Sequence, residues 1–252
     1  MELILSDIHA NLHALGAVLR HASRRTISRY VLLGDFVDYG VHPNEVMEKI
    51  HALEPKIMVR GNHDRACSSL VPIHHFSPVA RMACLWTRHQ LISKHSSFLG
   101  NLPMGPQTVS APSLVNEAFF ISHGSPSNED DYLADEWDAQ RSFRSFSGHL
   151  CFFGHTHIPG AFELDTVHDS MRWVALPAGK WFVLKPHCRY LVNPGSVGQP
   201  RDRDPRASFL YFDSEQWRVK LQRVDYDYEG AAKAILEAGF PKHLAERLFM
   251  GV

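Results

Sequence analysis

Short apolar runs that end in polar residues recur along the first quarter of the chain, and apolar residues at helical spacing follow them. We expect strands at residues 2–5, 30–33 and 56–59, and helices at residues 12–19 and 46–53. Strands that alternate with helices in this way predict βαβ units and a largely parallel sheet.

The middle of the chain changes character twice. Residues 66–102 carry an apolar stripe that includes Val79, Met82 and Trp86, which predicts helices packed over a sheet edge. Residues 102–114 are interrupted by Pro103, Pro106 and Pro112, so this stretch is expected to be a loop or a short edge strand.

The second half of the chain is rich in short β-type runs. Strands are expected at residues 118–121 and 150–153, and a second, mostly antiparallel sheet from residues 161–164, 173–176, 181–184, 190–192, 207–212 and 217–224. Two helices, at residues 229–236 and 242–249, are expected in the tail. No repeat or linker interrupts the pattern, so residues 1–252 are predicted to form a single domain.

Composition narrows the function classes. The chain has 252 residues with a formal net charge of −1 and no long run of like charges, so neither a nucleic-acid polymer nor a membrane is an expected partner. The four cysteines form no CxxC pair and are expected to be small buried residues rather than disulfide partners or metal ligands. Because the first residues are typical of a buried strand and not of a secretory leader, we expect a cytoplasmic protein.

The chain contains 17 histidines, and some of them stand beside carboxylates where the apolar runs stop. The polar residues at these positions are Asp7, His9, Asp35, Asn62, His63, Asp64, His123, His155 and His157. In α/β sheets, sites gather beyond the carboxyl ends of the strands, so residues far apart in sequence can converge there. Nitrogen and oxygen ligands without a thiolate favour Mn, Fe, Zn, Co or Ni.

Seven of these residues could ligate metal: Asp7, His9, Asp35, Asn62, His123, His155 and His157. A single tetrahedral site uses about four ligands, so two ions fit better than one. Two ions that share a bridging carboxylate and a hydroxide nucleophile form a clamp for displacement at phosphorus. The sequence therefore predicts a dinuclear centre of divalent transition metals, with manganese as the first choice.

Five motifs follow one another in the order found in the calcineurin-like metallophosphoesterases, which the chain resembles over essentially its whole length. They are Asp7-Ile8-His9, Gly34-Asp35-Phe36-Val37-Asp38, Gly61-Asn62-His63-Asp64, His123-Gly124 and Gly154-His155-Thr156-His157. The Asn193-Pro194-Gly195-Ser196-Val197 segment is similar to the compact bacterial and archaeal branch that includes small phosphodiesterases. Tyr39 stands where the protein Ser/Thr phosphatases carry an arginine.

The resemblance implies an α/β fold, a four-layer α-β-β-α sandwich of the metallophosphoesterase type. It also implies two ligand sets that share one carboxylate: Asp7, His9, Asp35 and His157 for one metal, and Asp35, Asn62, His123 and His155 for the other. His63 would face the leaving group as general acid or transition-state stabiliser, held by Asp64.

Other residues have two interpretations each. Asp38 is expected to orient a neighbouring side chain or cap a turn rather than to bind metal. Arg201, in the loop of residues 199–206, is a candidate contact to substrate phosphate, although solvated ion pairs are the alternative for that loop. Trp86 and Trp137 could stack a base, but core packing is the preferred interpretation.

We therefore expect an enzyme, a metal-dependent phosphoesterase that hydrolyses a phosphodiester or phosphoanhydride of a small molecule such as a nucleotide or dinucleoside polyphosphate. A protein Ser/Thr phosphatase is one alternative, and a non-catalytic scaffold that retains the fold is another. The segment between Asn62 and His123 is expected to cover one side of the metal site and to disfavour a folded protein substrate. Sequence leaves the oligomeric state open.

Overall fold

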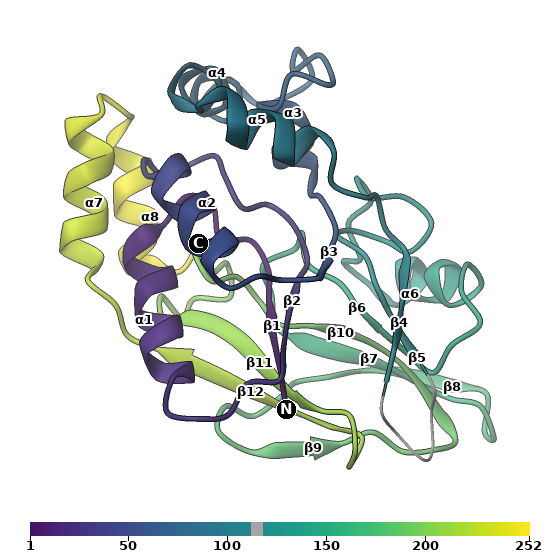
Figure 1. The fold of residues 1–252 in the computed structure, drawn as a ribbon. Coiled ribbons are helices and arrows are strands. Elements are labelled where there is room, and N and C mark those ends of the chain that lie inside the picture. The colour runs from purple at the N-terminus through teal and green to yellow at the C-terminus, as the bar shows by residue number, and fades with distance from the viewer. Residues whose placement is uncertain (112–117) are drawn as a thin grey trace.

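The computed structural model describes residues 1–111 and 118–252, so the end of the predicted stretch 102–114 lies outside the described residues. Its strands form two six-stranded sheets packed face to face, with helices on both outer faces (Figure 1). The four-layer sandwich that the resemblance implied is thus confirmed.

The first sheet has the strand order β3-β2-β1-β11-β12-β9. Its strands are β1 (Glu2–Leu5), β2 (Arg29–Leu32), β3 (Ile57–Met58), β9 (Trp181–Val183), β11 (Ala207–Asp213) and β12 (Arg218–Val224). Strands β1, β2 and β3 are parallel, as predicted, while β11, β12 and β9 add to β1 in antiparallel succession. The expectation that residues 181–184, 207–212 and 217–224 belong to a second sheet is therefore wrong.

The reason for this pairing lies in the two faces of β11. Phe209 and Tyr211 pack into the cluster under the helices, whereas Leu210 and Phe212 pack between the sheets. A strand buried on both faces belongs in the interior of a sheet. It is accommodated beside β1, whose residues are all buried.

The second sheet has the order β4-β5-β6-β10-β7-β8. Its strands are β4 (Gln107–Ser110), β5 (Ala118–Ile121), β6 (Leu150–Phe152), β7 (Gly160–Asp165), β8 (Ser170–Val174) and β10 (Cys188–Asn193). Strands β5, β6 and β10 are parallel, and the remaining pairs are antiparallel. Strand β4 lies at an edge, so the predicted edge strand is confirmed for residues 107–110.

Alternating side chains join the layers. Leu3 and Leu5 face the helix layer while Ile4 faces the other sheet, the period-two pattern of a strand buried on both sides. Between the sheets, the rings of Phe119, Phe152 and Phe212 contact one another with centroids 5.1–5.6 Å apart.

Helices cover the sandwich on three sides (Figure 1). The outer face of the first sheet carries α1 (Leu12–Ala22), α2 (Pro43–Ala52), α7 (Tyr228–Glu237) and α8 (Lys242–Met250), and the second sheet carries α6 (Glu136–Phe143). Near the carboxyl end of β3 lie α3 (Asn62–Cys67), α4 (Pro78–Gln90) and α5 (Ser93–Gly100). Both predicted tail helices are confirmed, whereas α6 was not predicted because its eight residues are too few for a clear apolar period.

Within the described parts of the chain, no helix combines the length and the apolar character needed to cross a membrane. Strands β1, β2, β3, β5 and β6 all present their carboxyl ends to the region that α3 overhangs (Figure 1). The polar residues that follow these strands therefore meet at one end of the sandwich.

Candidate metal centre

Six of the seven predicted ligands meet in two buried clusters. Asp7, His9 and His157 form the first, and Asp35, His123 and His155 form the second. In each cluster the possible ligand atoms lie within 4.8 Å of one another. The seventh residue, Asn62, joins the second cluster, since its Oδ1 lies 3.1 Å from His123 Nε2.

The backbone at five of these seven residues is left-handed, although none of them is glycine. The φ angles are 53° at Asp7, 48° at His9, 52° at Asp35, 65° at His155 and 62° at His157. This conformation is unfavourable for residues with a Cβ and persists only where the surroundings impose it. Here the amides of Asp7 and His9 donate to the carbonyl oxygens of Gly34 and Asp35 at 3.1 and 2.9 Å.

Two glycines make room for the carboxylates. A Cβ on Gly61 would lie 2.0 Å from Asp35 Oδ1, and one on Gly154 would lie 1.9 Å from Ser6 Oγ and 2.8 Å from Asp7 Oδ2. No side chain larger than hydrogen fits at such distances. These positions serve the close approach of backbone to ligand.

The imidazoles are held with one nitrogen aimed at the centre. The Nδ1 atoms of His9, His123 and His157 lie 3.2, 2.8 and 2.5 Å from the carbonyl oxygens of Val37, Leu33 and Gln199. A carbonyl only accepts hydrogen bonds, so each Nδ1 carries the proton and Nε2 is the ligand nitrogen. His9 Nε2 and His157 Nε2 then face each other at 3.2 Å, an arrangement that a cation between them would stabilise.

The carboxylates also indicate that cations bind between these side chains. Asp7 Oδ1 and Asp35 Oδ2 are buried and have no hydrogen-bond partner among the described residues. Imidazole nitrogens of His157 and His123 approach them to 3.3 Å. A buried carboxylate oxygen without a partner is costly, and a divalent ion would satisfy it. The donor set therefore fits two metal ions.

Charge coupling is strong within the clusters. Burial lowers the pKa of His123, but the negative charge of the Asp35 carboxylate outweighs burial and raises that pKa to about 10. Burial raises the pKa of Asp35, yet His123 and His63 hold it well below its ordinary value. Burial lowers the pKa of His155 to about 3. Without metal, His123 is therefore an imidazolium paired with Asp35, and His155 is neutral.

We predict that metal loading near pH 7 releases about one proton from His123, because its pKa of about 10 lies above that pH and ligation needs the free lone pair. The raised pKa also makes the stability of the metal-free protein depend on pH. The His123–Asp35 pair contributes its full stabilisation below about pH 6.5, and this contribution is lost as the pH rises through about 10. Calorimetric titration with Mn²⁺ in two buffers of different ionisation enthalpy measures the release. Equal heats in both buffers would contradict it.

His63 lies beside the clusters and is oriented by Asp38, not by Asp64. His63 Nδ1 lies 2.6 Å from Asp38 Oδ2. Both oxygens of Asp64 accept backbone amides instead, from Phe36 at 2.8 Å and Gly61 at 2.9 Å. The expectation that Asp64 holds His63 is thus wrong. Helix α3 begins at Asn62, so Asp64 occupies its third position and turns back to cap the helix start.

Two acidic neighbours favour the charged form of His63. Burial lowers its pKa, but Asp35 and Asp38 outweigh burial and the net shift is upward. The ring of Tyr39 lies 4.8 Å from that of His63, centroid to centroid. The role of His63 as a general acid stays a prediction, and its contact with Asp38 is compatible with it.

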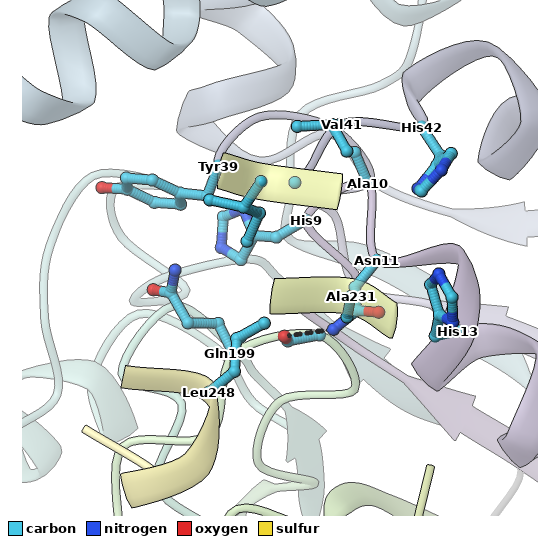
Figure 2. A pocket seen from close by; sticks show the side chains of 13 residues that line it. His9, Ala10, Asn11, His13, Tyr39, Val41, His42, Gln199, Ala231 and Leu248 are labelled. Carbon is cyan, nitrogen blue, oxygen red and sulfur yellow. Dashed lines mark hydrogen bonds between the residues drawn. The ribbon is translucent and has the colours of Figure 1, made fainter. Parts of the chain in front are cut away.

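The space around the centre is uneven. Toward α7 and α8, behind His9 and Tyr39, Figure 2 shows a narrow hollow in which Asn11 Nδ2 donates to the carbonyl oxygen of Gly198 at 2.9 Å. Its volume of about 20 Å³ has room for about one water molecule. On the opposite side, His63, Asn62 and His155 border a cavity of about 380 Å³. Substrate therefore has more room on the side of His63 than on the side of α7 and α8.

Arg201 lies close to the first cluster. Its backbone amide donates to the carbonyl oxygen of His157 at 3.4 Å, and its Nη2 donates to Gln199 Oε1 at 2.9 Å. Its buried Nε has no hydrogen-bond partner within the described chain. Its contact with substrate phosphate stays a prediction. In the same loop, Arg206 pairs with Asp204 at 2.7 Å, as the solvated ion-pair alternative expected.

Several other side chains near the centre have structural roles. Arg65 pairs with Glu129 and Asp130, and Arg88 donates to the carbonyl oxygens of Ala66 and Val71. Core packing, the preferred interpretation, is confirmed for Trp86, whose ring contacts Phe240 with centroids 5.2 Å apart. Core packing is wrong for Trp137, which is 77% exposed, and Trp137 borders neither of the larger cavities near the metal centre.

Sequence reasoning missed Tyr132. Its ring lies 3.9 Å from the ring of His155, centroid to centroid, and it borders the cavity beside His63. The only signal was an aromatic residue after two aspartates, a few positions beyond the His123 motif.

Comparisons with known proteins agree on one family. The profile of the calcineurin-like phosphoesterase superfamily domain matches residues 1–216. An uncharacterised protein of Methanocaldococcus jannaschii is 34% identical, over 100% of this chain and 98% of its own length. The crystal structure of a metallophosphoesterase from Sphaerobacter thermophilus has a TM-score of 0.87 at 38% identity, covering 100% of this chain and 98% of that one. A hypothetical protein of Pyrococcus horikoshii shares the fold, with a TM-score of 0.80 at 21% identity, 100% of this chain and 99% of that one.

Proposed function

The chain belongs to the calcineurin-like phosphoesterase superfamily, enzymes that hydrolyse phosphate esters with a dinuclear metal centre, and on this premise we propose that it cleaves a phosphodiester or phosphoanhydride of a small phosphorylated molecule. A nucleotide or dinucleoside polyphosphate is the proposed substrate class. The ligands are Asp7, His9, Asp35, Asn62, His123, His155 and His157.

One observation carries the proposal. Two clusters of buried ligand atoms, with facing imidazole nitrogens and unpartnered carboxylate oxygens, lie beside an ion pair of a histidine and an aspartate. The clusters account for two cations, and the His63–Asp38 pair accounts for a proton donor. Both assist hydrolysis of a P–O bond, the cations by activating the nucleophile and the donor by protonating a poor leaving group.

The residues of the site have separate roles in the proposed hydrolysis. When bound, the two ions supply the nucleophile and neutralise the charge of the phosphate oxygens. His63, protonated and held by Asp38, donates its proton to the leaving oxygen. Arg201, whose Nε is unpartnered, donates to a phosphate oxygen and is a substrate contact in this proposal.

The size of the site supports a small substrate. The cavity beside His63 measures about 380 Å³, the size of a small-molecule site. His75, Phe76 and Ser77, at and before the start of α4, wall it on one side. This wall supports a small molecule over a phosphoprotein, and the complete ligand set supports an enzyme over a scaffold.

We predict that protein loaded with Mn²⁺ binds about two ions per chain and turns over nitrophenyl phosphodiesters, with diadenosine tetraphosphate also cleaved and a phosphoserine peptide hydrolysed more slowly than either. Elemental analysis gives the first quantity and a turnover screen gives the others. Full metal content without turnover of any ester would favour the scaffold alternative. A peptide with the highest kcat/KM would favour the protein phosphatase.

Three further points belong to the proposal. Manganese is the proposed metal, with Fe, Zn, Co or Ni as alternatives that a ligand set of nitrogen and oxygen also suits. A single domain over residues 1–252 is supported by the pairing of β1 with β11. A cytoplasmic location is supported by the four free, buried cysteines, of which Cys67 and Cys84 have their Sγ atoms 3.6 Å apart.

A further inference from the structure

A second and larger cavity, of about 570 Å³, opens beside the metal centre. Aromatic side chains of Tyr132, Phe162 and Trp173 border it, together with Ile158 and Arg201. Asp135 and Glu136, at the start of α6, complete its rim. Its volume is in the range of ligand sites and exceeds that of the cavity beside His63.

Large apolar side chains are exposed around this cavity. Tyr132 is 51% exposed, Ile158 43% and Trp173 39%. Scattered apolar residues are ordinary on a protein surface, but several that rim one hollow mark a binding site. The exposed apolar side chains therefore indicate that the rim of this cavity binds an apolar group.

The aromatic wall is fixed before anything binds. Trp173 on β8 pairs with Phe162 on β7, and their rings meet edge to face with centroids 4.7 Å apart. The indole of Trp173 lies over Gly160, where a Cβ would come within 2.0 Å of the ring. A ring held in this way presents a flat surface at little entropic cost on binding.

The cavity and the metal centre share walls. Thr156, which borders the cavity, separates the predicted ligands His155 and His157 in sequence. Tyr132 stacks against His155 and borders both larger cavities. An occupant of this cavity can therefore be bonded directly to the phosphorus atom. His63 borders the other cavity, so the leaving group belongs there and the larger cavity takes the substituent that stays on phosphorus.

We infer that the cavity between Tyr132, Phe162 and Trp173 binds a nucleobase attached to the retained side of the substrate phosphate, an inference that rests on the proposed function. Aromatic walls suit a planar ring, and the rim carboxylates of Asp135 and Glu136 accept its N–H groups. Arg201 borders the same cavity and its amide contacts the carbonyl oxygen of the predicted ligand His157, so its side chain can reach the phosphate. An alkyl chain would use the walls but would make no hydrogen bond to these exposed carboxylates.

The test varies only the retained substituent. Three nitrophenyl diesters have the same leaving group and carry thymidine, octyl or methyl on the other side. We expect the thymidine ester to have the highest kcat/KM. Trp173→Ala should lower the ratio of the thymidine to the methyl ester about tenfold, the size typical of one lost base–aromatic stack. Trp137→Ala, a tryptophan outside the cavity, is the matched control and should keep the parent ratio.

A binding measurement tests the same cavity without turnover. Thymidine 5′-monophosphate should bind the metal-loaded parent and the Trp137→Ala variant equally, and the Trp173→Ala variant about tenfold more weakly, in calorimetric titration. Ala134→Phe, which fills the rim from an exposed loop, should weaken binding similarly and covers the case in which Trp173→Ala fails to fold.

The outcomes distinguish a failure of the proposed function from a failure of the nucleobase inference. If none of the three diesters is hydrolysed, the proposed function fails. If they are hydrolysed but both cavity variants keep the parent ratio and affinity, the nucleobase inference fails alone. If the octyl ester is preferred and the cavity variants remove that preference, the occupant is an alkyl chain and the inference is overturned.

Discussion

Replacing Asp35 with asparagine is expected to lower metal content from about two ions per chain to less than one, and turnover more than about 100-fold. Asp35 Oδ2 lies 3.3 Å from His123 and 3.7 Å from His9, so it faces both clusters. Losing even an outer partner of a ligand typically costs about 10- to 100-fold in metal affinity or activity. The loss of a shared, charged ligand should exceed that.

Elemental analysis after dialysis against Mn²⁺ measures the metal, and circular dichroism checks the fold. Asp38→Asn is the matched control, because Asp38 is also buried and acidic but contacts His63 and the Tyr39 amide. It should retain about two ions. An Asp35→Asn protein that also keeps two ions would exclude the bridging role.

The second large effect is expected at His63. His63→Ala should retain its metal yet lose about 10²–10⁴ in turnover on esters with poor leaving groups, the usual worth of general acid–base assistance. On nitrophenyl esters the loss should be much smaller, since nitrophenolate leaves without a proton. Steady-state kinetics on both classes decides the point. An equal loss on good and poor leaving groups would assign His63 to charge stabilisation.

The pH profile separates the two neighbouring aspartates. His63 donates only when protonated, and Asp38 helps to raise its pKa. Asp38→Asn should therefore shift the alkaline limb of kcat to lower pH on poor leaving groups. Asp64→Asn changes a helix cap, so it should lower thermal stability and leave that limb in place.

The convergence of the candidate ligands could be predicted from sequence, but the contacts of the residues beside them could not. Each ligand follows an apolar strand, and parallel strands bring their carboxyl ends to one edge. His63 and Asp64 are adjacent in sequence, and which of them faces the metal depends on where α3 begins. That start depends on the amides of Phe36 and Gly61, which Asp64 accepts, and the contact with Phe36 joins segments that are distant in sequence. The sequence spacing therefore located the motif correctly but led to the wrong partner for His63, Asp64 instead of Asp38.

The larger cavity escaped sequence reasoning for a similar reason. Trp173 and Tyr132 come from a β-hairpin and a loop that carry no motif, about 40 residues apart in the printed sequence. They meet because β8 lies at the edge of the second sheet, next to β7. Strand pairing between distant segments is not written in a local pattern. The same limit explains why β11 was assigned to the wrong sheet.

The position of β1 has a consequence for the order of events on the ribosome. Strand β1 is synthesised early, but Glu2 pairs with Phe212, so one of its edges lacks a partner until most of the chain has emerged. The segment that follows β1 also lacks its partners until late in synthesis, because the carbonyl oxygens of Ser6 and Asp7 accept the amides of Val197 and Gly198. The N-terminal ligands therefore reach their final geometry late, and a metal ion meets a nearly finished protein rather than a nascent chain.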